Sequence, residues 1–81
     1  MKEALHINYV LEQLDLAAKY GQRVNVHAWK RNGEIVEYNG WISTGGYWRG
    51  GIHRLKNPVN GEIRAVIDVL IFEYNGHPVY L

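Results

Sequence analysis

Hydrophobic and polar positions follow two different periods along this chain. Between Asn8 and Tyr20, apolar residues recur every three or four positions, at Val10, Leu11, Leu14, Ala17 and Ala18. This spacing places one apolar face on an α-helix. Asn8 is a candidate N-cap, and Gly21 stands where a left-handed residue ends a helix. The pattern predicts an amphipathic helix over residues 8–20 that docks its apolar face on the rest of the domain.

Beyond the helix the period changes to two, which is typical of β-strands. Two alternating runs are joined by a polar turn that ends at Gly33. A three-residue loop closed by Gly33 sets Ala28 against Val36 and Val26 against Tyr38. A two-residue loop would instead set Ala28 against Glu37 and Val26 against Asn39, which would place core residues and solvent-facing residues on the same face of the sheet. Strands are therefore predicted over residues 23–29 and 34–43.

The C-terminal part holds the densest group of β-branched and aromatic residues, followed by Asn75-Gly76. Asn-Gly between two such runs predicts a two-residue hairpin, because both turn residues need a positive φ. Strands are predicted over residues 52–55, 65–74 and 77–81. The hairpin register places Phe72 opposite Val79, Leu70 opposite Leu81 and Ile71 opposite Tyr80.

The 81 residues suffice for one domain with a single modest core, which spans residues 1–81. A helix followed by about five strands with short connections predicts the α+β class. In so short a chain the strands form a strongly bent antiparallel sheet or a small barrel of SH3-like or OB-like type.

Composition excludes several classes of protein. The hydrophobic content is 47% and the charged content is 21%, which argues against disorder. A net charge of +1 gives no overall field that would attract polyanions. The absence of cysteine excludes disulfides, thiol nucleophiles and thiolate metal sites. No apolar run is long enough for a signal core or a membrane span, so a cytoplasmic protein is expected.

A pattern of residues covering most of the chain resembles the Sm-like proteins, which include bacterial RNA chaperones. It consists of a helix followed by Val24-x-Val26, Asn32-Gly33, Tyr38-x-Gly40, an apolar strand and Asn75-Gly76. The resemblance implies a small SH3-type barrel and self-association. Two family motifs are missing: Ser43-Thr44-Gly45 stands where the family has an acidic residue, and His53-Arg54 stands nearest its Met-Asn pair. No base-contacting residue is therefore carried over. The ending from Gly61 to Leu81 also looks like small uncharacterised proteins of bacterial mobile elements.

The stretch between Glu37 and Glu62 contains no acidic residue. It carries Arg49, Arg54 and Lys56 among the aromatics Tyr38, Trp41, Tyr47 and Trp48, with two Gly-Gly pairs in the loop 45–51. Cations follow phosphates and aromatic faces stack unpaired bases, as in single-strand binders. Aromatic residues in a glycine-rich loop equally suit a protein-binding hot spot. A purely structural interpretation places Tyr38 in the core and Trp41 over a sheet face.

The remaining polar residues predict little chemistry. His6, His27, His53 and His77 share no metal-ligand spacing, so no metal or other cofactor is expected. His27 opposite Glu37 could act as a general base with a raised pKa, although an exposed polar pair is the more common arrangement. Asp68 lies in an apolar run and needs a partner if buried, for which Arg64 and Arg54 are candidates. No nucleophile, base and orienting group can be assembled, so an enzyme is not expected.

These observations favour a non-enzymatic binding and assembly module. The small net charge ranks a protein partner first, bound through the loop 45–51. The alternative is single-stranded nucleic acid, especially RNA, bound by Arg49, Arg54, Lys56 and Trp48. The predicted binding residues are Tyr47, Trp48, Arg49, Arg54, Lys56 and Trp41. Both faces of the C-terminal hairpin are apolar, which predicts a homodimer with Val69, Ile71 and Tyr80 in the interface.

Overall fold

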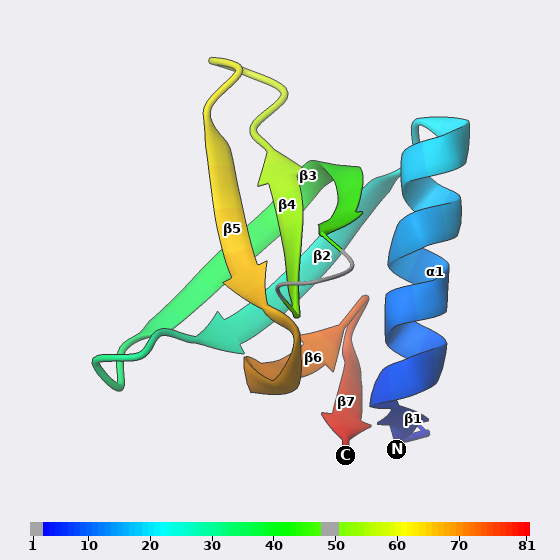
Figure 1. Cartoon of the computed structure of the whole chain (residues 1–81), viewed down its shortest axis with the longest axis vertical. Coiled ribbons are helices and arrows are strands. Elements are labelled where there is room, and N and C mark those ends of the chain that lie inside the picture. Colours follow the sequence, from blue (N-terminus) through cyan, green and yellow to red (C-terminus); the bar gives the residue numbers. More distant parts are fainter. Residues whose placement is uncertain (1–2, 48–50) are drawn as a thin grey trace.

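The computed structural model describes residues 3–47 and 51–81. In this part of the chain one α-helix packs on a seven-stranded sheet (Figure 1). The elements are β1 (Leu5–His6), α1 (Ile7–Tyr20), β2 (Arg23–Trp29), β3 (Ile35–Tyr47), β4 (Ile52–Lys56), β5 (Ile63–Ile67), the 3-10 turn η1 (Asp68–Leu70), β6 (Ile71–Tyr74) and β7 (His77–Tyr80). The order across the sheet is β1-β7-β6-β2-β3-β4-β5, so β1 and β5 form its edges.

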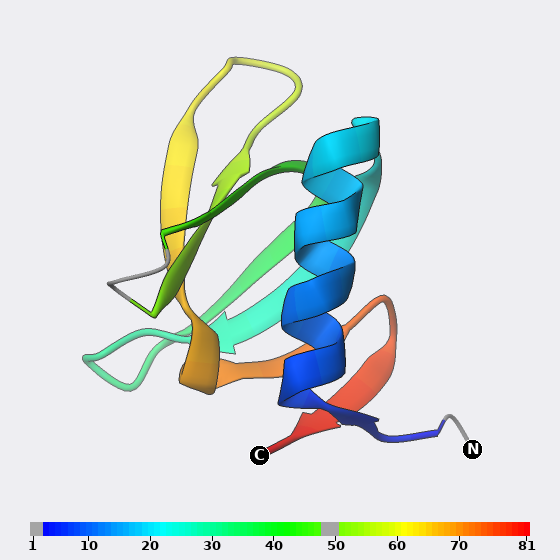
Figure 2. The same cartoon turned by 45° about the vertical axis from the view of Figure 1, so that its right-hand side comes forward.

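The predicted helix is confirmed, with a different N-cap. The His6 ring accepts a hydrogen bond from the Asn8 backbone N–H, so His6, and not Asn8, caps α1. Gly21 ends the helix in the left-handed conformation, with a φ of 67°. Figure 2 shows α1 lying across one face of the sheet. Its buried residues are Ile7, Val10, Leu14 and Ala17, all of which belong to the core.

The β2–β3 hairpin has the predicted register. Ala28 pairs with Val36, and Val26 pairs with Tyr38. Lys30 donates its N–H to the Glu34 carbonyl, and Gly33 has a φ of 88°, as a three-residue loop requires. β3 runs on to Tyr47, beyond the predicted end at residue 43, because its second half pairs with β4.

The predicted strand over residues 65–74 is wrong. The chain pairs with β4 as far as Ile67, turns through η1, and pairs with β2 from Ile71 onward. The turn is held by two backbone hydrogen bonds, from the Asp68 N–H to the Gly51 carbonyl and from the Ile71 N–H to the Asp68 carbonyl. η1 therefore carries the chain from the β4 side of the sheet to the β2 side, and the single long strand becomes β5 and β6.

The C-terminal hairpin turns as predicted. Asn75 and Gly76 have φ values of 49° and 84°, and Tyr74 pairs with His77 across the turn. Leu70 lies in η1 and Leu81 follows β7, so the expected strand pairing of these two residues is not formed. The turn is tied to the middle of the sheet, because Asn25 donates its N–H to the Asn75 side chain and accepts from the Asn75 N–H.

The α+β class is confirmed, but the number of strands and the closure of the sheet differ from expectation. Seven strands are described where about five were predicted, and they form an open sheet instead of a closed barrel. β3 bends at Gly40 and Gly45, whose φ values are 71° and 99°, and its pairing with β4 shifts between Ser43 and Gly45. No helix in the described part of the chain has the length and hydrophobicity needed to cross a membrane.

Candidate functional site

A groove of about 550 Å³ lies between β5 and the distal half of the β2–β3 hairpin. We call it the β5 groove; its floor is formed by Ala28, Val36, Tyr38, Trp41 and Val66. Figure 1 shows β5 crossing the β2–β3 hairpin in this region. The groove exists because the bent sheet turns β5 toward the hairpin without closing the barrel.

The residues that form the floor of the groove belong to the hydrophobic core or pack against it. Tyr38, Val66 and Ala28 are all buried. The rings of Tyr38 and Trp41 meet edge to face, with centroids 4.7 Å apart. Burial raises the pKa of the Tyr38 hydroxyl above its ordinary value, while the charge of Arg64 lowers it and that of Glu62 raises it. The hydroxyl is therefore neutral at physiological pH, and the floor is apolar apart from this hydroxyl and the indole N–H of Trp41.

Charged side chains line the rim of the groove. Glu62 and Arg64 form an ion pair on the β5 side. Lys30 and Arg31 lie at the β2–β3 turn, and Glu37 lines the same groove. Within residues 3–47 and 51–81, neither Lys30 nor Arg31 forms an ion pair with a carboxylate. The end of the groove at the turn therefore offers cations to an acidic group of a ligand.

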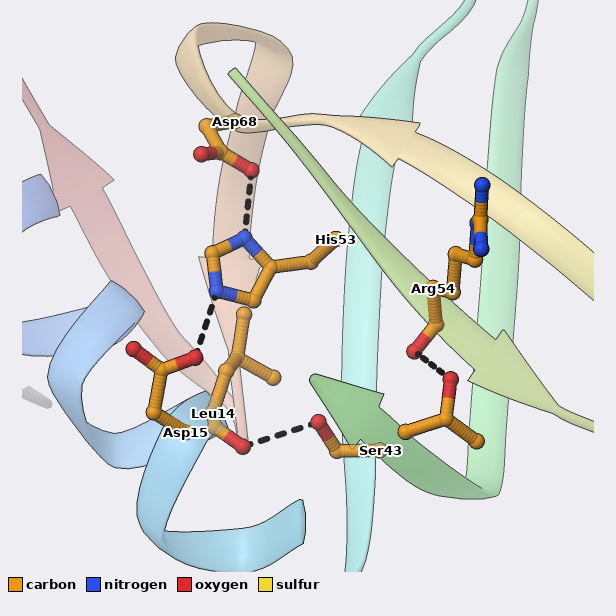
Figure 3. Close-up of polar contacts among 7 residues, drawn as sticks. Leu14, Asp15, Ser43, His53, Arg54 and Asp68 are labelled. Carbon is orange, nitrogen blue, oxygen red and sulfur yellow. Dashed lines mark hydrogen bonds and ion pairs between the residues drawn. The ribbon is translucent and has the colours of Figure 1, made fainter. Parts of the chain in front are cut away.

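A buried histidine joins three elements of the fold. Figure 3 shows the ring of His53, on β4, between the carboxylates of Asp68 and Asp15. The ring nitrogens lie 2.7 Å from Asp68 Oδ1 and 3.0 Å from Asp15 Oδ1. His53 and Asp68 are buried, whereas the Asp15 side chain is 63% exposed. Each ring nitrogen of His53 thus has one carboxylate oxygen within hydrogen-bonding distance.

This network corrects the prediction for Asp68. Arg64 and Arg54 were its expected partners, and His53 is the partner instead. A carboxylate occupies each ring nitrogen, which leaves none to take a proton from a substrate. The nearby Ser43 hydroxyl donates to the Leu14 carbonyl of α1 and is buried. We therefore interpret the His53 network as a fastening between α1, β4 and η1.

The chain matches no protein-family model, no curated protein and no solved structure. Its function is therefore inferred from the contacts, burial and charges of its own residues. Among the features described, the β5 groove combines accessible space with a defined arrangement of aromatic and charged side chains.

The structure describes the side chains of three of the six predicted binding residues, and these three do not share one site. Trp41 lies in the floor of the β5 groove. Arg54 and Lys56 are exposed on β4, on the face opposite to the buried His53 and Leu55. The backbone of Tyr47 ends β3, while its side chain, together with Trp48 and Arg49, lies outside the described residues. Sequence spacing alone gave no sign that β5 would come to lie beside Trp41.

The predicted interface residues are also separated. Val69 and Tyr80 are exposed, but Ile71 is only 3% exposed and packs in the core of the same chain. The expected alternation along one strand is interrupted by η1, so Val69 and Ile71 no longer belong to a common face. Only Val69 and Tyr80 remain on the surface as candidates for contact with a second copy.

Each histidine has its own contact in the structure. His6 caps α1, His77 bonds the Glu3 carbonyl, and His53 lies between its two carboxylates. Within the described ranges, no three side chains of histidine, aspartate or glutamate gather as a potential metal site. His27 pairs with Glu37 in the strand register as predicted, yet its ring bonds Glu73 and Asn39.

The environment of His27 favours its charged form. Burial lowers the pKa of His27, but hydrogen bonds with Asn39 and Glu73 and the charges of Glu73 and Glu37 outweigh this and raise it above 6.5. The raised pKa was predicted; the dominant carboxylate is Glu73, from β6, and not Glu37. Figure 1 shows β6 running beside β2, a neighbour that lies far away in sequence.

We expect the stability contributed by His27 to decrease at alkaline pH. A histidine whose pKa is higher in the folded state than in the unfolded state stabilises the fold fully at pH values below its unfolded pKa of 6.5. This stabilisation is lost as the pH rises through the pKa of the folded state. The difference in free energy of unfolding between wild type and His27→Gln, measured by urea denaturation across a pH series, should shrink accordingly. An NMR titration midpoint for the His27 ring at or below 6.5 would contradict this.

Proposed function

We propose that this chain is a non-enzymatic binding and assembly module that holds a segment of a partner protein in the β5 groove. The observation that carries the proposal is the aromatic floor of Tyr38 and Trp41 beneath a charged rim. Binding sites commonly combine an apolar floor with a few polar groups that fix orientation. Aromatic side chains at such a floor contribute much of the affinity of protein interfaces.

Several features support binding over catalysis. The groove is lined by Glu37, Glu62, Arg64 and the neutral Tyr38 hydroxyl, which do not form a nucleophile held by a base and an orienting group. Glu62 is already paired with Arg64. The buried histidine network is occupied at both ring nitrogens. The side chains of this site thus suit recognition of a ligand.

Two further contacts belong to the proposal. The loop 45–51, with Tyr47, Trp48 and Arg49, joins β3 to β4 and is proposed to add contacts to a protein partner. Self-association as a dimer is proposed to use the exposed side chains of Val69 and Tyr80. Neither Val69 nor Tyr80 lines the β5 groove, so one chain could bind a partner and a second copy together.

Single-stranded nucleic acid is the alternative ligand. Arg54 and Lys56 are both exposed on the same face of β4, which follows the loop that carries Trp48 and Arg49. Cations beside aromatic side chains suit an unpaired strand. We rank this function second because the net charge of +1 provides little attraction for a polyanion.

The proposal is tested by selecting random linear peptides from a display library on the wild-type protein. Peptides that bind in the β5 groove should lose affinity about tenfold or more for Arg64→Glu, because this change reverses a charge at the rim. Lys19→Glu is the matched control: it changes the net charge equally, at an exposed position on α1. Affinity is measured by fluorescence anisotropy of the labelled peptides.

Failure to select any peptide, or equal loss of affinity in the two variants, would contradict the proposal. Labelled single-stranded RNA and DNA are titrated in parallel at two salt concentrations. Salt-dependent binding that weakens in Arg54→Ala and Lys56→Ala, in the absence of peptide binding, would instead support the nucleic-acid function.

A further inference from the structure

The free edge of β5 exposes backbone hydrogen-bonding groups. On either side of the β4–β5 ladder, the Asn57 N–H bonds the Glu62 carbonyl and the Asp68 N–H bonds the Gly51 carbonyl. Hydrogen-bonded and non-bonded pairs alternate along an antiparallel ladder. By this alternation, the residues between them whose N–H and C=O groups point away from β4 are Ile63, Ala65 and Ile67. In the part of the chain that the structure describes, no strand pairs on that side.

The two edges of the sheet are unequally protected. At one edge, β7 contains Pro78 and is covered by the two-residue β1, which leaves little edge for pairing. β5 has the sequence Ile-Arg-Ala-Val-Ile, which contains no proline, and its one charged residue, Arg64, is paired with Glu62. Ile63 is 57% exposed at its start. A free edge without proline that carries an exposed apolar residue can pair with another strand.

The β5 groove lies along this same strand. Arg64 and Val66, on the core-facing side of β5, line the groove together with Tyr38 and Trp41 of the hairpin. A strand added to the β5 edge would direct every second side chain toward the floor of the groove, because side chains alternate between faces. The cations Lys30 and Arg31 stand at the end of the groove near the β2–β3 turn.

From these observations we infer that the partner segment binds as an additional β-strand along β5. The ligand is an extended peptide with apolar residues at alternate positions and an acidic residue at the end that meets Lys30 and Arg31. Backbone hydrogen bonds to Ile63, Ala65 and Ile67 give affinity, and the groove selects the side chains. The inference rests on the function proposed above and specifies the chemistry of its ligand.

Ala65→Pro tests the backbone contact directly. The Ala65 N–H points away from β4, so proline removes a donor at the free edge and leaves the β4–β5 ladder intact. Selected peptides should bind Ala65→Pro about tenfold or more weakly than wild type. The free energy of unfolding of Ala65→Pro in urea should stay near that of wild type, because no hydrogen bond of the β4–β5 ladder is removed.

A second measurement uses the unmodified protein. Each selected peptide is N-methylated at one backbone position at a time. If the peptide forms a strand on β5, methylation at alternate positions abolishes binding and methylation at the intervening positions has little effect. This readout does not depend on the folding of any variant. The selected sequences should also alternate apolar residues and carry an acidic residue near one end.

The outcomes separate the inference from the proposed function. Weaker binding in Arg64→Glu with unchanged binding in Ala65→Pro, or N-methylation effects without alternation, would overturn strand addition and leave the groove as the site. Peptides insensitive to both variants would contradict both. Sedimentation equilibrium showing a dimer that Ala65→Pro dissociates would identify a second copy as the occupant of the β5 edge and overturn the peptide ligand.

Discussion

Replacing Asp68 by alanine is expected to lower the free energy of unfolding by about 1–3 kcal/mol, the cost of leaving a buried hydrogen-bonding group without its partner. The Asp68 carboxylate lies 2.7 Å from the His53 ring, and both residues are buried. Without it, a ring that sits among core residues keeps only the partly solvated Asp15. The loss is measured by urea denaturation followed by tryptophan fluorescence.

Asp15→Ala is the control for this experiment. Asp15 also bonds the His53 ring, but its side chain is 63% exposed, so water replaces much of the contact. The expected loss is below about 1 kcal/mol, as for exposed ion pairs. Equal losses in the two variants would show that burial does not set the strength of these contacts, and a small loss for Asp68→Ala would exclude the fastening role of the network.

The second large effect is expected at the centre of the helix. Leu14 is 1% exposed and lies on the buried face of α1. Leu14→Ala should therefore lower the free energy of unfolding by about 2–5 kcal/mol. The loss combines the missing hydrophobic transfer with the cavity that remains. Ser43 also donates to the backbone carbonyl of Leu14, which holds the helix in place and limits collapse of the cavity.

Leu16 provides the matched comparison on the same helix. It is 42% exposed, so the identical leucine-to-alanine change should cost less than about 1 kcal/mol. Both variants keep the helix propensity high, since alanine is the best helix former. A loss below about 1 kcal/mol for Leu14→Ala would contradict the docking of α1 on the sheet.

The parts of the fold predicted correctly are those fixed by neighbouring residues. Gly21 ends the helix, Gly33 sets the register of the β2–β3 hairpin, and Asn75-Gly76 makes the C-terminal turn. At each of these turns the chain needs a positive φ, which few residues adopt readily. The signal therefore lies within a few residues of the structure that it specifies.

The turn at η1 was missed because no such signal marks it. Asp68-Val69-Leu70 contains neither glycine nor proline, and apolar residues continue on both sides. Asp68 is the only charged residue in the apolar sequence from Ala65 to Phe72. Its burial beside His53 is a long-range contact, so the reason for the turn cannot be read from the local pattern.

The partner of Asp68 could have been found from the alternation of β4. Leu55 is a core residue, so His53, two positions before it, shares its face and points inward. A histidine on that face is a natural partner for a buried carboxylate. Asp15 gave no comparable signal, because its contact with His53 joins residues 38 positions apart.

The candidate site was only partly predictable, because it also depends on contacts between residues far apart in the sequence. Trp41 was singled out from the aromatic-basic stretch, and it does line the β5 groove. Val66 and Arg64 reach the groove because the bent sheet turns β5 toward the β2–β3 hairpin. That approach depends on the bends of β3 at Gly40 and Gly45, whose effect on strands far along the chain has no local signature.

The position of β2 in the middle of the sheet has a consequence for synthesis of the chain on the ribosome. Its neighbour β3 follows immediately, but its other neighbour, β6, arrives much later, as the bond between Asn25 and Asn75, 50 residues apart, illustrates. Chains emerge from the N-terminus onward. Until residues 71–74 have emerged, the central strand of the finished domain is an open edge, and the nascent chain is then most exposed to pairing with other chains.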